Sequence, residues 1–202
     1  MIVTDAWFPQ TNGVVRTLAH TAAWLGRFGH EVRTLTPRNF RSIPCPTYPE
    51  IRLSLFPARG VREAIGSFAP QALHIATEGP LGMAARGYCV SRRMGFTTSY
   101  HTQFPQYVRA RFPVPLRASY WALRRFHSAG TRCMVSTRTL REDLAGRGFR
   151  NLATWRRGVD TEMFRPQPKE FLELPRPVAA YVGRVAIEKN IEAFLKMPWS
   201  GS

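Results

Sequence analysis

Residues 2–29, IVTDAWFPQTNGVVRTLAHTAAWLGRFG, decide the fold because they join a short apolar run to a helical pattern through a long connection. Apolar side chains at Val14, Leu18, Ala22 and Leu25 recur at the spacing of one helix face, which predicts a helix after the connection. The connection holds two large aromatic residues, a proline and an Asn-Gly pair, although a few residues would join a strand to a helix. Connections of this kind often carry function, so this one is a candidate site.

The alternation of strand-like runs and helical patterns continues along the chain. Further strands are predicted at residues 31–37, 51–55, 72–77, 96–100, 133–137 and 152–155. Further helices are predicted at residues 60–70, 79–95, 115–130 and 138–148, and an ordered, proline-rich loop at residues 39–50. Strands that alternate with helices favour a parallel sheet covered on both faces, which is a Rossmann-like, doubly wound α/β fold.

A stretch with four prolines separates this pattern from a second, shorter one. Residues 1–158 are predicted to form the doubly wound domain, residues 159–177 a linker, and residues 178–202 the first strand and helix of another domain. One strand and one helix cannot bury a core, so residues after about 175 are expected to pack poorly or to lean on the first domain.

The composition favours a globular protein of the reducing cytoplasm. Hydrophobic residues make up 44% of the 202, which is enough for a core, and no apolar run reaches the 18 residues of a membrane-spanning helix. The N-terminus lacks the basic, apolar and small-residue regions of a signal peptide. Cys45, Cys89 and Cys133 are odd in number and far apart, a pattern that fits neither a disulfide framework nor a metal site.

The net charge of +16 is unusually high, with 29 Lys and Arg against 13 Asp and Glu. One interpretation is a solvated surface rich in arginine. The other is attraction to anions such as phosphate groups, a phospholipid surface or nucleic acid, and the charge alone does not separate the two. Because the basic residues are scattered and do not form one dense tail, a nucleic-acid partner is not expected.

Several residues lie at the carboxyl ends of predicted strands or at the N-termini of the helices that follow, where ligands bind in an open parallel sheet. Gly13 begins a helix, where backbone N–H groups could approach a phosphate, although the local sequence favours an ordinary turn and helix start. Glu78 either bonds a ligand hydroxyl or simply favours a helix N-terminus. Residues 157–160 follow the last strand of the domain and are interpreted as a structural turn into the linker.

His101 is the histidine in the best position for chemistry, because it follows a strand directly and precedes a long aromatic loop. There it either positions a ligand group or is a hydrogen-bonded structural residue. The other histidines lie within or beside predicted helices and strands and are expected to be structural: His20, His30, His74 and His127.

Arg184 and Lys189 flank the connection from the last predicted strand to the last predicted helix. A planar guanidinium and a point charge near a helix N-terminus suit a diphosphate, and the alternative is solvated surface charge. The sequence contains no Asp-x-Asp motif for a metal-bound nucleotide and no Gly-x4-Gly-Lys-Ser/Thr loop for a phosphate. A carboxylate metal site and a P-loop are therefore not expected.

Six stretches occur in an order that matches a known family. They are TDAWFPQTNGVVRTL, GHEVRTLTP, HIATEGPLG, TSYHTQFPQY, RRGVDTEMFRP and VGRVAIEKN. Together they resemble retaining GT-B glycosyltransferases of family four, and most closely the lipid-directed subgroup that includes mannosyltransferases and diacylglycerol glycosyltransferases. The resemblance extends from Thr4 to about Leu195.

The resemblance implies two Rossmann-like domains across a cleft, of which the N-terminal one holds the acceptor and the C-terminal one a nucleotide-sugar. It places Gly13 near the donor diphosphate and His101 beside the reacting sugar, which that histidine helps to position. Arg184 and Lys189 would grip the diphosphate and stabilise charge on the leaving group. Such enzymes need no metal or other cofactor, and their partners are the nucleotide-sugar and a lipid or small-molecule acceptor.

Three further residues stand in the same motifs and are candidate contacts to the acceptor or the sugar: Asn12, Glu78 and Tyr100. The sequence departs from the family pattern after about Leu195, where most of the second domain is missing. We therefore expect a truncated chain that has no turnover by itself. The expected ancestral activity is retaining transfer of a hexose to a lipid, with the protein cytoplasmic and peripheral on the inner face of the membrane. The alternative is a non-catalytic module that binds an anionic membrane or an acceptor.

Overall fold

The computed structural model describes residues 1–45, 48–101, 114–166, 178–183, 185 and 190–197. These residues belong to two compact units, Met1–Arg157 and Gly158–Ser202. The first unit contains all of the described strands, and the predicted domain boundaries at residues 158 and 177 stay predictions.

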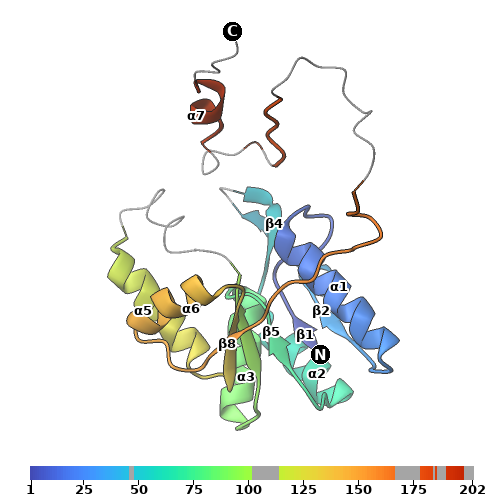
Figure 1. The fold of residues 1–202 in the computed structure, drawn as a ribbon. Coiled ribbons are helices and arrows are strands. Elements are labelled where there is room, and N and C mark those ends of the chain that lie inside the picture. Colours follow the sequence, from blue (N-terminus) through green and yellow to red (C-terminus); the bar gives the residue numbers. More distant parts are fainter. Residues whose placement is uncertain (46–47, 102–113, 167–177, 184, 186–189, 198–202) are drawn as a thin grey trace. The chain divides into compact units, whose positions relative to one another are not determined.

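A parallel sheet forms the centre of the first unit (Figure 1). Its strands, in spatial order, are β2 (Thr34–Leu35), β1 (Ile2–Val3), β5 (His74–Ile75), β6 (Thr97–Tyr100), β7 (Arg132–Val135) and β8 (Leu152–Thr154). Each neighbouring pair runs parallel. The chain passes from β1 outward to β2, then returns to the other side of β1 with β5 and continues outward to β8. This winding confirms the predicted Rossmann-like α/β fold.

Helices connect these strands and cover both faces of the sheet. They are α1 (Gly13–Arg27), α2 (Ala58–Phe68), α3 (Pro80–Ser91), α5 (Leu116–His127) and α6 (Arg138–Gly146), with a 3-10 turn η1 (Pro37–Asn39). The pleat of β1 separates the two faces. Ile2 packs with Leu18 of α1, whereas Val3 packs with Val61 of α2 and Leu81 of α3.

A third apolar cluster fixes the far half of the sheet. It joins Leu123 of α5 and Leu144 of α6 to Val135 of β7, and all three side chains are buried. The helical spacing of apolar residues thus places one face of each helix in the core, as the sequence pattern predicts.

Residues 39–50, predicted as an ordered loop, contain part of a hairpin. β3 (Ser42–Cys45) pairs antiparallel with β4 (Tyr48–Ser54) in a separate two-stranded sheet. The loop prediction was therefore wrong over most of its length. Pro44 obscured the strand because proline cannot donate to a ladder, yet each strand of a two-stranded sheet has an outer edge where that N–H is not needed.

The described part of the second unit contains one helix, α7 (Ile191–Leu195). Residues 178–183, where a strand is predicted, do not form one, and no described residue from 158 to 197 is buried. Among the described residues of this unit, no second strand is present to satisfy the backbone groups of an extended segment, which accounts for this difference. None of the described helices of either unit is long and apolar enough to cross a membrane.

Candidate functional site

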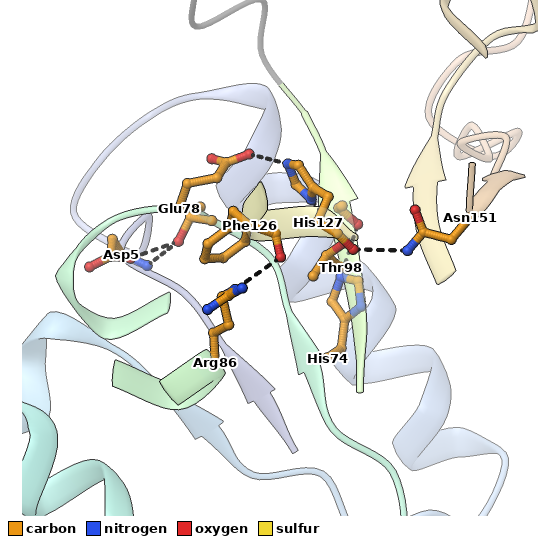
Figure 2. Close-up of polar contacts among 10 residues, drawn as sticks. Asp5, His74, Glu78, Arg86, Thr98, Phe126, His127 and Asn151 are labelled. Atoms are coloured by element: carbon orange, nitrogen blue, oxygen red, sulfur yellow. Dashed lines mark hydrogen bonds and ion pairs between the residues drawn. The ribbon is translucent and has the colours of Figure 1, made fainter. Parts of the chain in front are cut away.

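The carboxyl ends of β1 and β5 meet where the winding of the sheet reverses, which is the edge that binds ligands in open α/β folds. Asp5 follows β1, and Glu78 lies between β5 and the start of α3. Figure 2 shows these two side chains together with His74 and His127. The polar residues of this edge therefore come from segments far apart in the sequence.

Asp5 caps helix α3 from a distance. Its carboxylate accepts hydrogen bonds from the Leu81 N–H at 2.9 Å, the Gly82 N–H at 3.3 Å and the Thr77 hydroxyl at 2.9 Å. The helix has Gly79 at its N-cap, where a Cβ atom would overlap this carboxylate. Burial raises the pKa of Asp5, and the three hydrogen bonds oppose that shift. The anion-binding end of α3 is thus occupied by a carboxylate of the chain itself.

Glu78 forms an ion pair with the buried His127 of α5, and Figure 2 shows the two side chains pointing toward each other. The His127 Nε2 donates to Glu78 Oε1 at 3.0 Å, and its Nδ1 lies 2.9 Å from the Thr98 hydroxyl. Burial alone would lower the pKa of His127, but hydrogen bonds with Cys133 and Glu78 and the Glu78 charge together raise it to about 9. His127 is therefore protonated at neutral pH, and its bond to Glu78 holds that side chain in one place.

The end of α5 that carries His127 is itself anchored. Arg86 of α3 donates to the Phe126 carbonyl at 3.1 Å, and Asn151 donates to the His127 carbonyl at 2.8 Å. Both bonds are drawn in Figure 2. Carbonyls at a helix C-terminus lack partners within the helix, so these donors satisfy them and fix the His127 ring.

His74 is a neutral structural histidine. Its Nδ1 lies 2.8 Å from the Thr97 hydroxyl and its Nε2 lies 2.9 Å from the Ser99 hydroxyl. Burial, with a smaller contribution from the N-terminal charge, lowers the pKa of His74 to about 4. With both ring nitrogens bonded inside the sheet, His74 supports β6 and does not act on a ligand.

His101 directly follows β6 and stands beside Arg157. The Arg157 Nη2 lies 3.5 Å from His101 Nδ1, and the Trp155 ring lies 6.2 Å from the imidazole, centroid to centroid. Burial first, and then the Arg157 charge, lowers the pKa of His101 to about 3. Its other nitrogen, Nε2, is buried and has no hydrogen-bond partner among the described residues. Buried polar atoms are usually hydrogen-bonded, so Nε2 is a candidate donor to a ligand.

The N-terminus of α1 lies close to the same arginine. Asn12 is the N-cap, and its Oδ1 accepts from the N–H groups of Val14 and Val15, each at 3.0 Å. Gly13 is the first helical residue, and a Cβ atom there would lie 3.4 Å from Arg157 Nη1. Arg157 thus brings Gly13 and His101, two residues predicted for the site, into one neighbourhood.

The other predicted site residues have different surroundings. Tyr100 is 2% exposed and packs beside Leu123 in the α5–α6 core, so a ligand contact there stays a prediction. Arg184 and Lys189 lie outside the described residues, and their diphosphate role also stays a prediction. No group of three or more potential metal ligands occurs among the residues that were described.

Three residues of this edge were not predicted from the sequence to belong to the site. Arg157 was assigned to a turn, although its place after the last strand puts it at the ligand edge. Asp5 follows β1 in the same way, and that position was its only signal. The pairing of His127 with Glu78 had no sequence signal, because the two are 49 residues apart.

The sequence was compared with known proteins. Residues 11–163 match the model of Glycosyltransferase Family 4. The chain is 26% identical to a GDP-mannose-dependent alpha-mannosyltransferase of Mycobacterium tuberculosis, over 100% of this chain and 60% of that protein. It is also 26% identical to the sulfoquinovosyl transferase SQD2 of Arabidopsis thaliana, over 95% of this chain and 42% of that protein. A mannosyltransferase of Mycolicibacterium smegmatis is 27% identical over 95% of the chain and 57% of its own length.

The chain thus spans about half the length of the curated relatives it matches. The family match covers the strands from β2 to β8 and the edge that holds Gly13, His101 and Arg157. The six ordered motifs and the sheet agree with this match, and the resemblance noted from the sequence is confirmed. The chain belongs to glycosyltransferase family 4.

Proposed function

We propose that this chain is the acceptor-side part of a retaining glycosyltransferase that moves a hexose from a nucleotide-sugar to a lipid or similar acceptor. The family supports sugar transfer from an activated donor. The relatives are named for mannosyl transfer from GDP-mannose and for sulfoquinovosyl transfer, which favours a nucleotide-sugar donor here.

The observation that carries the proposal is the convergence of Gly13, Arg157 and His101 beside the carboxyl edge of the sheet. A transferred sugar with its diphosphate needs a hydrogen-bond donor for a sugar hydroxyl and a positive, sterically open place for phosphate. His101 Nε2, buried and without a partner among the described residues, suits the first requirement. The helix start at Gly13, with a guanidinium beside it, suits the second.

The packing around Gly13 supports a functional reason for the glycine. The nearest atom to a Cβ at this position would be a guanidinium nitrogen of Arg157 at 3.4 Å, which is ordinary van der Waals contact. Its φ is also not among the positive values that favour glycine. Packing in the described structure therefore permits alanine, and the open space is available to a ligand phosphate approaching the helix N-terminus.

In this proposal each residue has a separate task. His101, neutral because its pKa is low, donates to a hydroxyl of the reacting sugar and orients it. Gly13 admits the diphosphate, while Arg184 and Lys189 hold it and stabilise the negative charge that develops on the leaving group. Glu78, fixed by His127, is a candidate acceptor for another hydroxyl.

The test is turnover of a nucleotide-sugar, measured with GDP-mannose and with UDP-glucose as donors. The 202-residue chain alone is expected to give none. A fusion to the part of the Mycobacterium tuberculosis relative that lies beyond the match is expected to be active. In that fusion, His101→Ala should lower turnover by about 100-fold, because the sugar loses its orientation.

A matched control separates this effect from a loss of structure. His30→Ala changes an exposed histidine after the end of α1 and should leave turnover unchanged. Equal activity of the His101→Ala and His30→Ala fusions, with both folded, would remove His101 from the proposed site. If the fusion is active and its turnover does not depend on His101, another residue must contact the sugar.

A second candidate function is a non-catalytic module that binds an anionic membrane, and one feature of α5 favours it. Arg117, Trp121, Arg124 and Arg125 are exposed and recur at the spacing of one helix face. The opposite face of this helix is buried in the core. Arginines beside a tryptophan suit the surface of an anionic bilayer, where the ring reaches the interface and the charges meet lipid phosphate.

Co-sedimentation with vesicles tests this module. We expect the chain to prefer vesicles that contain phosphatidylserine over phosphatidylcholine alone. Replacing Arg117, Arg124 and Arg125 with Gln should weaken binding by roughly 3 kcal/mol, at about 1 kcal/mol for each charge near the surface. As a control, the same number of exposed arginines on other elements, Arg16, Arg62 and Arg138, are replaced with Gln. Equal loss in both triple variants would assign the binding to net charge and not to α5.

A further inference from the structure

Arg157 occupies a position that neither the family match nor the sequence motifs assign to a task. It follows β8 by three residues, and its side chain is exposed. One guanidinium nitrogen, Nη1, would lie 3.4 Å from a Cβ at Gly13, and the other, Nη2, lies 3.5 Å from His101 Nδ1. Exposed arginines are common, but the guanidinium of this one lies beside both Gly13 and His101, which suggests a specific role.

The chemistry of the guanidinium decides which imidazole nitrogen of His101 carries hydrogen. Every N–H of arginine is a donor, and the group has no acceptor at any accessible pH. The His101 Nδ1 that faces it must therefore be the unprotonated, accepting nitrogen. A hydrogen on Nδ1 would also point at a full positive charge. The single hydrogen of the neutral ring then lies on Nε2.

We propose that Arg157 is a positioning residue that holds His101 in the tautomer with hydrogen on Nε2. Nε2 is the buried nitrogen without a hydrogen-bond partner among the described residues. Arg157 thereby converts an ambiguous imidazole into a defined donor aimed at an oxygen of the ligand. The identity of that oxygen as a sugar hydroxyl rests on the proposed function, whereas the tautomer does not.

The charged groups that lower the pKa of His101 are cationic. Arg157 and the ionised His127 are cationic, and His74 is hydrogen-bonded to two hydroxyls and neutral. Trp155 contributes an apolar ring. Glu78, the carboxylate of this edge, is already paired with His127. Burial and these charges lower the pKa of His101, so the neutral ring is kept through the physiological range.

Nitrogen NMR on the 202-residue chain tests the proposal without any ligand. The histidines are labelled with ¹⁵N in the ring, and the His101 signals are identified by their loss in His101→Gln. We expect the wild-type ring to show a protonated Nε2 and an unprotonated Nδ1 down to pH 5. In Arg157→Met the ring should populate both tautomers, and its pKa should rise toward the ordinary 6.5.

Two further variants make the result specific. Arg157→Lys keeps a donor and a positive charge, so it should retain most of the Nε2-protonated form. Arg156→Met removes the neighbouring exposed arginine and should change nothing at His101. The unchanged signals of His127 report in each case that α5 and the sheet remain folded.

The outcomes separate this inference from the proposed function. A wild-type ring with hydrogen on Nδ1, or a tautomer unchanged by Arg157→Met in a folded chain, would overturn the role of Arg157. The expected tautomer together with a fusion in which His101→Ala keeps full turnover would leave Arg157 as a positioning residue and reject the sugar contact. If Arg157→Met leaves the tautomer unchanged and His101→Ala leaves turnover unchanged, both proposals are rejected.

Discussion

Replacing Glu78 with Gln should weaken the pH dependence that the buried His127 gives to stability. In the wild-type chain the folded state raises the pKa of His127 from 6.5 to about 9, because its bonds with Cys133 and Glu78 outweigh burial. Glutamine keeps the size of the side chain but removes the charge. Burial, the largest single influence on this ring, is then opposed mainly by Cys133, and the folded pKa of His127 falls from its wild-type value.

The sign and size of the effect follow from the two pKa values. A group whose pKa is raised in the folded state adds stability that is complete below the unfolded value and is lost as the pH rises through the folded value. For His127 the window runs from 6.5 to about 9 and corresponds to roughly 3 kcal/mol at about 1.4 kcal/mol for each unit. In Glu78→Gln the folded pKa of His127 is lower than in wild type, so less of this stability is present below the folded pKa.

Urea unfolding followed by circular dichroism measures this difference at intervals between pH 5 and pH 10. Other groups titrate in the same range. Burial lowers the pKa of the Met1 amino group and raises that of the Cys89 thiol to about 11. Both groups are present in wild type and variant alike, so they cancel in the difference between the two stability curves. Only the difference is assigned to the Glu78–His127 pair.

The expected difference is a wild-type advantage that is largest at the acid end of this range and shrinks toward pH 9.5. Parallel curves across the whole range would refute the reasoning, because they would mean that His127 has the same protonation in both proteins. A Glu63→Gln variant serves as the matched control. Its carboxylate pairs with Arg59 on an exposed helix surface, so its loss should change stability little at any pH.

Two further predictions concern the helix starts at the same edge. Gly13→Ala should keep or slightly raise the free energy of unfolding, since alanine is the better helix former. The same change should lower the turnover of the active fusion. Unchanged turnover would mean that Gly13 is an ordinary helix start. Asp5→Ala should lower the free energy of unfolding by about 2–4 kcal/mol, because it leaves the buried N–H groups of Leu81 and Gly82 without an acceptor. Asp5→Asn, which keeps one acceptor oxygen, should cost less in the same urea titration, and an equal cost would contradict the capping role.

The sheet and its winding were predictable because their signals are local and repeat along the chain. Alternating strand-like runs and helical faces predicted the order of elements, and buried residues such as Leu18 and Leu144 occupy the predicted faces. The hairpin at β3 and β4 was missed because Pro44 is evidence against a strand unless that strand lies at an edge. Some strands are also shorter than the sequence predicts. The strand β1, for example, ends where the following loop turns away to cap a helix.

The candidate site was predictable only in part, for a different reason. Gly13 and His101 follow strands in sequence, and the rule that strand ends gather at one edge suffices to pair them. Arg157 obeys the same rule but stands in a stretch that also begins the linker, so its local sequence favoured a turn. The bond between His127 and Glu78 depends on how α5 packs against α3, and no local pattern encodes such a packing.

The length of the opening connection has a physical explanation in these contacts. Residues 5–12 serve two helices: Asp5 reaches α3, and Asn12 caps α1. The two caps differ in charge. A carboxylate neutralises the N-terminus of α3, whereas the amide of Asn12 leaves the positive end of α1 in place, with the Arg157 guanidinium beside it. An anion that approaches this edge is therefore repelled from α3 and attracted to α1. Of the helix starts at α1 and α3, the choice of Asp5 beside one and Asn12 at the other leaves α1 the more favourable for an anion.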